Sequence, residues 1–310
     1  MHIVLFFPDR LPVRGYGGTQ RMLVRLGEAL AERGHRISVV CGEGSALPFA
    51  TVIPVDAQRA RGGDFRLEPH LPDNLDIVCS FIPVHQPPPV PWVWRLAGNL
   101  RPGRTAPPNT IFVSSDHARR NGSTSFVLNG VDPHEFTFQP QKSAFDLFLG
   151  RLHRVKGYRW AIEGARKAGR RLVVAGGWRL SFRPGTRYVG TVDGQRKREL
   201  LEDARCLWMP ALWDEPCAGV LLESLMSGTP IIGTHRGCLP EIVSPDVGIL
   251  GDSVDELVEA AARIDRLNPA ACRARAERWF SSERMAGEYE RFFAHYVKVG
   301  TLPAGEPAGA

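Results

Sequence analysis

Short, fully apolar runs alternate with amphipathic helical stretches along most of this chain, and this alternation constrains the fold more than any other feature. The apolar runs are not interrupted by polar residues, which is typical of strands buried on both faces of a parallel sheet. We therefore expect strand–helix–strand units with right-handed crossovers, and hence doubly wound α/β sheets. The predicted strands lie at residues 2–7, 37–41, 76–79, 110–113, 145–149, 171–175, 206–209 and 230–233.

The series of strands and helices stops and starts again, which predicts two domains. A chain of 310 residues is long enough for two cores of about 150 residues each. The polar segment 139–143 precedes a fresh strand at Phe145, so we place the boundary near residue 140. We expect two Rossmann-like halves, at 1–140 and 141–281, that face each other across a cleft. An aromatic helix at 282–299 and a disordered tail at 300–310 complete the expected organisation.

The charge balance and the cysteines narrow the class of protein. With 39 Lys and Arg against 33 Asp and Glu, the net charge of +6 is too weak to indicate nucleic-acid binding and suits an anionic ligand such as a phosphate ester. The six cysteines show no C-x-x-C spacing, which favours a reducing compartment over a zinc or redox site.

The sequence shows neither a secretory signal nor an apolar run of the roughly 18 residues that a membrane span needs. We therefore expect a cytoplasmic protein. Cations at 166–171 and at 196–198 are read as solvated helix faces. A peripheral membrane contact through them stays open, as does the oligomeric state.

Glycines follow the first predicted strand and lie directly before a helix pattern. Gly15, Gly17 and Gly18 would let the backbone approach a ligand, and the N–H groups that begin a helix attract an anion. Position 20 is Gln, so the third glycine of a dinucleotide fingerprint is missing. A tight turn without any ligand is the alternative interpretation.

Two cations follow the first strand of the second half. Gly150 and Arg151 end the apolar run, and Lys156 with Gly157 come within the next six residues. This is the carboxyl edge of the predicted sheet, where open α/β folds bind their ligands. Arginine can grip a diphosphate with two hydrogen bonds, and lysine adds a point charge. Two solvated surface cations would give the same pattern.

A pair of glutamates gives the most specific signal. Glu215 lies on the loop after a strand that ends at Pro210, and Glu223 lies on the helix that begins near Pro216. We expect the start of this helix to point at the cleft, where a carboxylate can accept hydrogen bonds from the paired hydroxyls of a sugar. Cys217 has no base near it in the sequence, so we interpret it as a packing residue.

In this order and spacing, these motifs resemble the family-4 retaining glycosyltransferases, which have the GT-B architecture, and in particular short bacterial members that act in glycoside or antibiotic assembly. Further matching segments lie at 129–132, before the interdomain link, and at 241–243. The motifs that carry the resemblance are Gly17-Gly18, Gly150-Arg151 with Lys156-Gly157, and Glu215-Pro216 with Glu223, Gly228 and Pro230.

The resemblance implies transfer of a sugar from a nucleotide-diphosphate donor to an acceptor hydroxyl, with retention of the anomeric configuration and no cofactor. It implies that Glu215 contacts the donor sugar, that Glu223 binds the ribose, and that Arg151 and Lys156 neutralise the diphosphate. It also implies that the first domain lies on the acceptor side and that the aromatic helix crosses back onto it. The other implied donor contacts are Gly17, Gly18, Gly190, Val192, Ala218, Gly219 and Val220. No Asp-x-Asp occurs, so no metal site is predicted.

The sequence departs from the family pattern at two places. Cys217-Ala218 stands where the family usually has Phe-Gly, and the segment 92–96 lacks the histidine that usually lies close to the donor sugar. His85 and His117 are the nearest candidates to replace it. A non-catalytic nucleotide-sugar-binding subunit therefore stays open as an alternative. A GT-B-type epimerase or phosphorylase is less favoured, because neither extra acid–base histidines nor a cofactor lysine is evident. A dehydrogenase is disfavoured by the missing glycine fingerprint.

Overall fold

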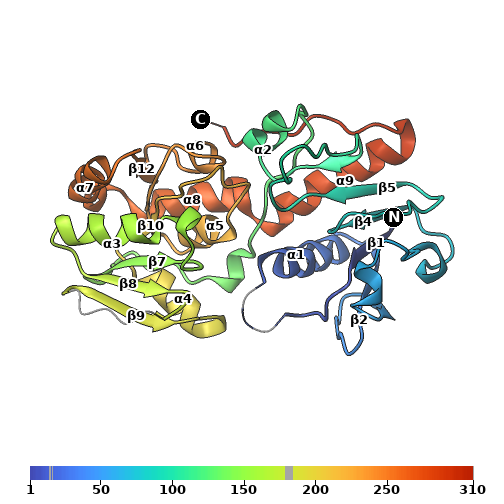
Figure 1. Ribbon diagram of the computed structural model, residues 1–310, viewed down its shortest axis with the longest axis horizontal. Helices are drawn as coiled ribbons and strands as arrows, with labels where there is room; N and C mark the ends of the chain where they lie inside the picture. The colour runs from blue at the N-terminus through green and yellow to red at the C-terminus, as the bar shows by residue number, and fades with distance from the viewer. Residues whose placement is uncertain (14, 16, 179–183, 310) are drawn as a thin grey trace. The chain divides into compact units, whose positions relative to one another are not determined.

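A computed structural model describes residues 1–13, 15, 17–178 and 184–309 of the chain. These residues form two compact units, each described here by itself (Figure 1). Unit 1 comprises Met1–Gly130 and Ser282–Pro307, and unit 2 comprises Val131–Ser281 with the last residues, Ala308–Ala310. Each unit is built around one parallel six-stranded sheet.

The sheet of unit 1 has the strand order β3-β2-β1-β4-β5-β6, and all of its pairings are parallel. Side chains of β1 alternate between two apolar clusters, with Ile3 and Leu5 in one and Val4 and Phe6 in the other. Burial on both faces is the reason that the strand reads as one continuous apolar run. The strands are β1 (His2–Phe7), β2 (Arg36–Gly42), β3 (Thr51–Val55), β4 (Ile77–Ser80), β5 (Trp92–Arg95) and β6 (Thr110–Ile111).

The sheet of unit 2 repeats this topology. Its order is β12-β11-β10-β7-β8-β9, again with parallel pairings. Counted from the first strand of each unit, both orders are 3-2-1-4-5-6, the doubly wound order of dinucleotide-binding folds. The fold class expected from the sequence is therefore confirmed. The strands are β7 (Asp146–Leu149), β8 (Leu172–Ala175), β9 (Thr186–Gly190), β10 (Leu207–Met209), β11 (Ile231–Gly233) and β12 (Gly248–Leu250).

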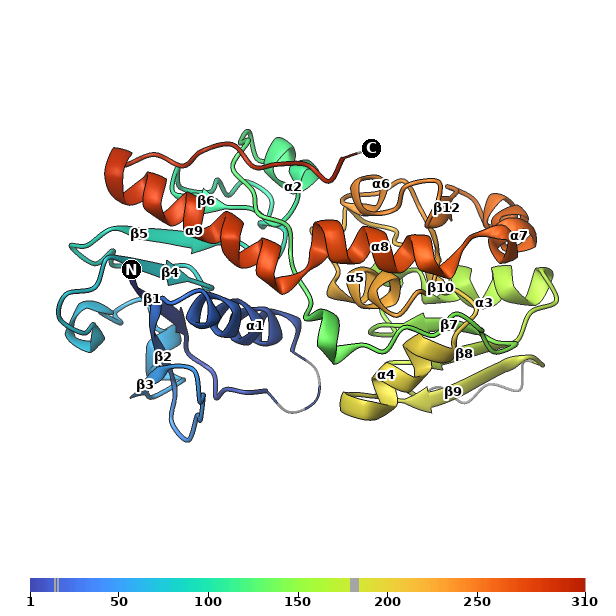
Figure 2. The same ribbon diagram turned by 180° about the vertical axis from the view of Figure 1, so that it is seen from behind.

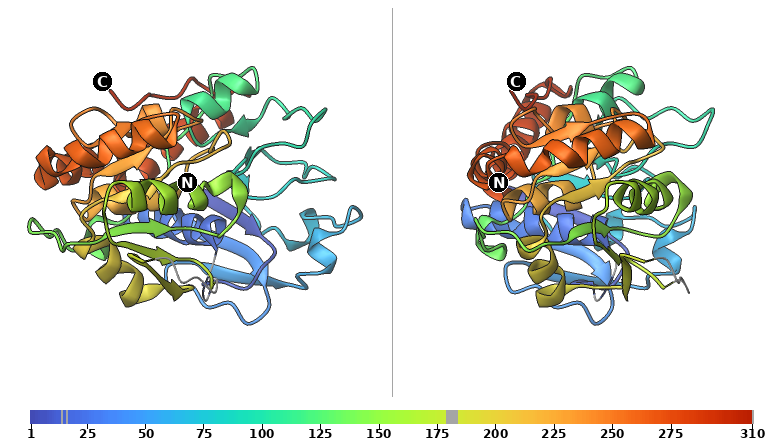
Figure 3. Two further views of the ribbon diagram at one scale, coloured as in Figure 1. Left: turned by 60° about the vertical axis from the view of Figure 1, so that its left-hand side comes forward. Right: turned by 90° about the vertical axis from the view of Figure 1, so that its left-hand side faces the viewer.

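Helices cover both faces of the sheet of unit 2 (Figure 3). Apolar side chains of α3 and α7 pack with Phe148 and Trp208 on one face, and α5 packs on α8 on the other. The helices of unit 2 are α3 (Tyr158–Lys167), α4 (Gly194–Asp203), α5 (Gly219–Met226), α6 (Leu239–Ile242), α7 (Val254–Arg263) and α8 (Pro269–Phe280).

Unit 1 contains α1 (Gly18–Glu32), α2 (Ser115–Arg120) and α9 (Ser282–Val299). The last of these is the aromatic helix of the sequence, and it lies along α1 (Figure 2). Tyr289, Phe292 and Phe293 are fully buried in the same apolar cluster as Leu23 and Leu26 of α1.

The chain passes from unit 1 to unit 2 at Gly130–Val131, earlier than the boundary expected near residue 140. The physical reason is that the intervening segment is held by the end of unit 2. Val131 donates a backbone hydrogen bond to Phe280 O at 2.9 Å. The guanidinium of Arg273 donates to the carbonyl oxygens of Pro133 and Phe136 at 3.0 and 2.8 Å.

The segment after α9 differs from the disordered tail that its composition suggests. Gly305 donates to Thr124 O at 2.9 Å, and Leu302 packs against the apolar cluster of unit 1. Arg284 pairs with Glu306 at 2.9 Å. These contacts hold the segment in place, because they give it a backbone hydrogen bond, an apolar contact and an ion pair. Its Pro, Gly and Ala residues alone would not order it.

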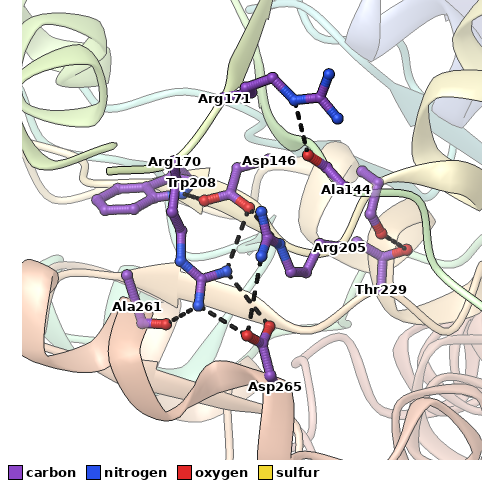
Figure 4. A network of polar contacts seen from close by, with 10 residues as sticks. Ala144, Asp146, Arg170, Arg171, Arg205, Trp208, Thr229, Ala261 and Asp265 are labelled. Atoms are coloured by element: carbon purple, nitrogen blue, oxygen red, sulfur yellow. Dashed lines mark hydrogen bonds and ion pairs between the residues drawn. The ribbon is translucent and has the colours of Figure 1, made fainter. Parts of the chain in front are cut away.

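A buried charge network closes the amino end of the sheet in unit 2 (Figure 4). The carboxylate of Asp146, at the first residue of β7, is fully buried. It accepts hydrogen bonds from Arg205 Nε at 3.0 Å and from Trp208 Nε1 at 2.9 Å. Arg170 lies 3.5 Å away and also pairs with Asp265 at 2.9 Å. Arg170 is therefore part of the packed interior, and the expectation of a solvated face at 166–171 is wrong for this residue.

Candidate functional site

The topology of unit 2 singles out one place for a ligand. Doubly wound sheets bind ligands outside the carboxyl ends of the strands, where the strand order reverses. In unit 2 this point lies between β7 and β10, which are neighbours in the sheet but not in sequence. The loops that leave these two strands carry Arg151 and Lys156 on one side and Glu215 on the other.

A glycine lets the two loops come into contact. Gly157 has a left-handed φ of 68°, and a Cβ atom there would lie 1.7 Å from Pro210 O. Leu212 donates a backbone hydrogen bond to Val155 O at 2.8 Å, which joins the loops a second time. Only glycine tolerates both the positive φ and the short distance to Pro210, so Gly157 determines the position of the loop that carries Lys156.

Lys156 and Glu215 form a buried ion pair at this point. Nζ of Lys156 lies 2.5 Å from Oε2 of Glu215, and the two side chains are 11% and 7% exposed. Trp213 completes the cluster: its Nε1 donates to the same Oε2 at 2.7 Å. The ammonium of Lys156 also lies 5.2 Å from the centroid of the Trp213 ring. The sequence motifs pair Lys156 with Arg151 and treat Glu215 separately, so neither the Lys156–Glu215 ion pair nor the contact with Trp213 was predicted.

The backbone of Glu215 is held from the side of β11 as well. Gly237, with φ of 61°, approaches so closely that a Cβ atom would lie 2.2 Å from Glu215 N. Cys238 donates to Glu215 O at 2.9 Å. Glu215 is therefore fixed on a loop that is held on both sides, which gives its carboxylate a rigid position.

Helix α5 begins directly after this loop. Ala218 is its N-cap residue, and Gly219 and Val220 form its first turn. N–H groups in the first turn of a helix have no partner within the helix and carry partial positive charge. Ala218, Gly219 and Val220 are only partly buried. The positions expected to offer backbone donors therefore lie at a helix start, beside the loop that carries Glu215.

The second glutamate pairs with a lysine from the cation run 196–198, which the sequence pattern predicts to be solvated. Glu223 of α5 is buried, and its Oε1 lies 2.7 Å from Nζ of Lys197 of α4. The side chain of Lys197 is 15% exposed, so the interpretation of 196–198 as a solvated face is wrong for this residue. The available signal was its spacing: Lys197 precedes the buried Leu200 and Leu201 by three and four residues and shares their face.

The remaining expected positions lie at the same carboxyl edge. Arg151 is exposed directly after β7, and Val192 is partly buried between β9 and α4. Gly190, at the end of β9, accepts a hydrogen bond from Gly176 N at 2.7 Å. A Cβ atom on Gly190 would lie 2.7 Å from Trp178 Nε1. The indole of Trp178 therefore rests on Gly190, and the side chain is 75% exposed.

In unit 1, Gly17 and Gly18 lie at the start of α1. A Cβ atom on Gly17 would lie 2.8 Å from Cγ1 of Val13, whereas one on Gly18 would meet nothing within 4 Å. Steric crowding therefore requires glycine at the first position only. Tyr16 of this loop lies outside the described residues.

Neither histidine candidate shows the expected features of a group poised on a substrate. His85 is exposed on a loop. His117 is fully buried in α2, where its ring packs edge-on against Phe112 with a centroid distance of 5.0 Å. Among the residues that the structure describes, neither ring nitrogen of His117 has a hydrogen-bond partner. Burial, helped by the charge of Arg120, lowers the pKa of His117 to about 4.

Metal ligands, membrane-spanning helices and cysteine pairing each bear on the class of site. No three His, Cys, Asp or Glu side chains within the described ranges gather as a metal site would require. The part of the chain that the structure covers has no helix long and apolar enough to cross a membrane. The six cysteines are buried free thiols.

Comparisons with known proteins find a similarity in part of the chain. Residues 146–266, all of them in unit 2, match the family model for glycosyl transferases group 1. An uncharacterized glycosyltransferase of Methanocaldococcus jannaschii is 28% identical over 151 residues, which are 39% of this chain and 38% of the relative. The chain thus spans little more than a third of that relative's length.

Solved structures match over nearly the whole chain. AviGT4, a glycosyltransferase involved in avilamycin A biosynthesis, has a TM-score of 0.77 at 24% identity, over 97% of this chain and 99% of that one. Sucrose-phosphate synthase from Thermosynechococcus elongatus has a TM-score of 0.70 at 15% identity, over 96% and 99%. Anabaena HepE, solved with UDP and glucose, has a TM-score of 0.68 at 13% identity, over 95% and 99%. At these identities the likeness establishes the GT-B fold.

Proposed function

We propose that this protein is a family-4 type glycosyltransferase that moves a hexose from a nucleotide-diphosphate donor to an acceptor hydroxyl, with retention of the anomeric configuration and without a metal ion. The observation that carries the proposal is the Lys156–Glu215 ion pair, 2.5 Å long and buried. It lies at the reversal point of a sheet within a glycosyl transferases group 1 domain. In this proposal Lys156 is the cation for the leaving diphosphate, Glu215 is the carboxylate for the sugar, and their ion pair supports a shared site for both.

The chemical task is to stabilise negative charge on the departing diphosphate. Arg151 and Lys156 supply positive charge, and the N–H groups of Gly219 and Val220 supply the dipole of a helix start. Such preorganised donors act without a metal ion. The leaving phosphate would take the proton of the acceptor hydroxyl on the same face of the sugar, which accounts for retention.

The rest of the donor would extend along the same edge. Glu223 would accept hydrogen bonds from the ribose hydroxyls, and Ala218 would add a backbone donor. Gly190 and Val192 would lie near the base. The exposed indole of Trp178, which rests on Gly190, offers a planar apolar surface on which a base can stack, a contact worth about 1–3 kcal/mol.

The first donors to test follow from the solved structures that resemble this protein. HepE has been solved with UDP-glucose and with UDP, so UDP-hexoses are the first donors to try. Six buried free thiols fit a reducing compartment, and we propose that the protein works in the cytoplasm.

A panel of UDP-, GDP-, ADP- and dTDP-sugars tests this function, with nucleotide release as the readout and EDTA added in parallel. We expect release with one base, unchanged by EDTA, and an NMR spectrum of the product that keeps the anomeric configuration of the donor. Loss of release with EDTA or an inverted product would contradict the corresponding part of the proposal.

A non-catalytic nucleotide-sugar-binding subunit is the second candidate. The observation that favours it is the absence of a histidine in β5, Trp92–Arg95, together with the burial of His117. Binding of a nucleotide sugar without release of nucleotide, in the presence of varied acceptors, would support this candidate. Conversion of the donor to an isomer, with no nucleotide released, would indicate an epimerase.

A further inference from the structure

Trp213 contacts both charges of the ion pair at the candidate site. Its Nε1 donates to Oε2 of Glu215 at 2.7 Å, and its ring lies 5.2 Å from the ammonium of Lys156. The ammonium donates to the same Oε2 at 2.5 Å. Three side chains thus form one closed cluster, and Trp213 is the member without a charge.

The two donors share one oxygen of the carboxylate. No hydrogen bond to Oε1 of Glu215 is found within the described part of the chain, and Oε1 is not among the fully buried unsatisfied atoms. Two N–H donors on Oε2 hold the orientation of the carboxylate. Oε1 is thereby left to accept a hydrogen bond from a sugar hydroxyl.

In the proposed reaction the ammonium of Lys156 interacts with two anions. It neutralises Glu215 in the structure, and the proposed reaction also requires it to neutralise a diphosphate. When the ammonium turns toward a phosphate, Glu215 would lose its strongest donor. The indole N–H lies on the same loop, two residues from Glu215, and remains. The aromatic face also attracts the cation, which limits the positions that Lys156 can take.

Trp213 is not a core residue whose burial would explain its position. Its side chain is only partly buried, whereas Trp208 of β10 is fully buried in the apolar cluster of unit 2.

We propose that Trp213 is a positioning residue for sugar transfer: its indole N–H fixes the carboxylate of Glu215, and its ring guides Lys156 between that carboxylate and the diphosphate. This inference rests on the proposed function, since it assigns Trp213 to the same site.

Two substitutions separate the roles of the N–H and the ring. Trp213→Phe keeps an aromatic face and removes the donor, so we expect kcat to fall about tenfold or more while the affinity for a nucleoside diphosphate changes less than about twofold. Trp213→Leu removes both, so the affinity should also fall, by about fivefold, because a partly desolvated cation–π contact is lost. Trp160→Phe, in α3 beside the apolar cluster, is the matched control and should change neither quantity.

Normal turnover of Trp213→Phe would overturn the proposal. So would equal losses of kcat, nucleotide affinity and melting temperature in this variant, because that pattern indicates a purely structural role. A drop in kcat alone, with the melting temperature within the range of the Trp160→Phe control, supports it.

A spectroscopic test does not depend on activity. In a ¹H–¹⁵N correlation spectrum, the indole signal of Trp213 is the one that Trp213→Phe removes. Glu215→Gln should shift that signal clearly, because its hydrogen bond then goes to a neutral amide. An unchanged signal would overturn the contact itself. If the signal shifts but the wild-type protein turns over no nucleotide sugar, the proposed function fails while the placement of Trp213 stands.

Discussion

Nζ of Lys197 lies 2.7 Å from Oε1 of Glu223, and this pair ties α4 to α5 beneath the carboxyl edge of the sheet in unit 2. Both side chains are largely buried, so neither charge is well solvated if its partner is removed. We therefore expect Lys197→Met to destabilise the fold by about 3 kcal/mol, at the lower end of what breaking a buried pair costs. Chemical denaturation measures this directly.

The neighbouring arginine provides a matched control for Lys197. Arg196 pairs with Glu199 at 3.0 Å on the surface, and its side chain is 56% exposed. Arg196→Met should change the free energy of unfolding by less than about 1 kcal/mol. Equal effects of the two substitutions would show that the Lys197–Glu223 pair is as solvated as a surface pair.

Arg151 and Lys156, the two cations proposed to bind the diphosphate and called here the phosphate clamp, should differ in how their replacement affects the melting temperature. Arg151→Ala and Lys156→Ala should each weaken the binding of a nucleoside diphosphate by about 1.5–3 kcal/mol, and that of the nucleoside much less. Only Lys156→Ala should also lower the melting temperature, because it leaves the buried Glu215 without its cation. Calorimetric titration with diphosphate and nucleoside provides the comparison, and equal losses for both ligands would argue against a phosphate clamp.

Gly157 should tolerate alanine far less well than another left-handed glycine nearby. Both Gly157 and Gly169 have positive φ, of 68° and 66°, but only at Gly157 would a Cβ atom collide with backbone, 1.7 Å from Pro210 O. Gly169→Ala should cost about 1–2 kcal/mol for its torsion alone. Gly157→Ala should cost clearly more and should also reduce activity, because it separates the loops that pair Lys156 with Glu215. Similar unfolding free energies for the two variants would contradict the close approach of these loops.

The stability of the protein should decrease as the pH falls from about 6.5 toward 4. Burial lowers the pKa of His117 to about 4, so in this range the unfolded chain binds a proton that the folded protein does not. Stability is then fully present above the unfolded pKa and is lost on acidification, by as much as about 3 kcal/mol from this residue. Burial also lowers the pKa of His2, which contributes in the same direction.

The variant His117→Leu isolates this contribution. Because the ring nitrogens of His117 have no hydrogen-bond partner in the described ranges, leucine removes the titrating group without breaking a side-chain hydrogen bond there. The difference in melting temperature between pH 7 and pH 5 should shrink in the variant, with His2 responsible for part of what remains. An unchanged difference would show that the His117 ring is not held neutral by burial.

The central strands could be predicted from the sequence because their apolar runs are buried on both faces, as β1 and β7 show. The expected strands missed β3, β9 and β12, which lie at the edges of the two sheets, and also β5, which lies next to the edge strand β6. Thr51, Ile53 and Pro54 of β3 are partly or fully exposed, so β3 lacks a continuous apolar signal. A short run of half-buried residues carries too little hydrophobic pattern to stand out from a loop.

Those parts of the candidate site that depend on a backbone constraint could be predicted from a motif. The contacts between charged side chains could not, because each depends on a partner from another segment. The glycine after Lys156 marks a close approach, and the structure shows one. The partners of Glu215 and Glu223 belong to separate segments, and only folding shows that Trp213 and Lys197 reach them. A cation in a run of cations, such as Lys197, is predicted to be solvated unless its spacing to buried leucines is weighed as well.

Nucleotide release at saturating donor, measured for the wild-type protein and for Glu215→Gln and Glu223→Ala, tests the central claim most directly. Glu215 is assigned to the transferred sugar, where charge develops as the bond breaks, so Glu215→Gln should lower kcat while nucleotide affinity is preserved. Glu223 is assigned to the ribose, which does not change in the reaction, so Glu223→Ala should weaken donor and nucleotide binding more than it lowers kcat. It should also lower the melting temperature, because it leaves the largely buried Lys197 without its partner. Normal turnover by Glu215→Gln, particularly with a lowered melting temperature, would show that Glu215 only supports the loop before α5, and would contradict the account.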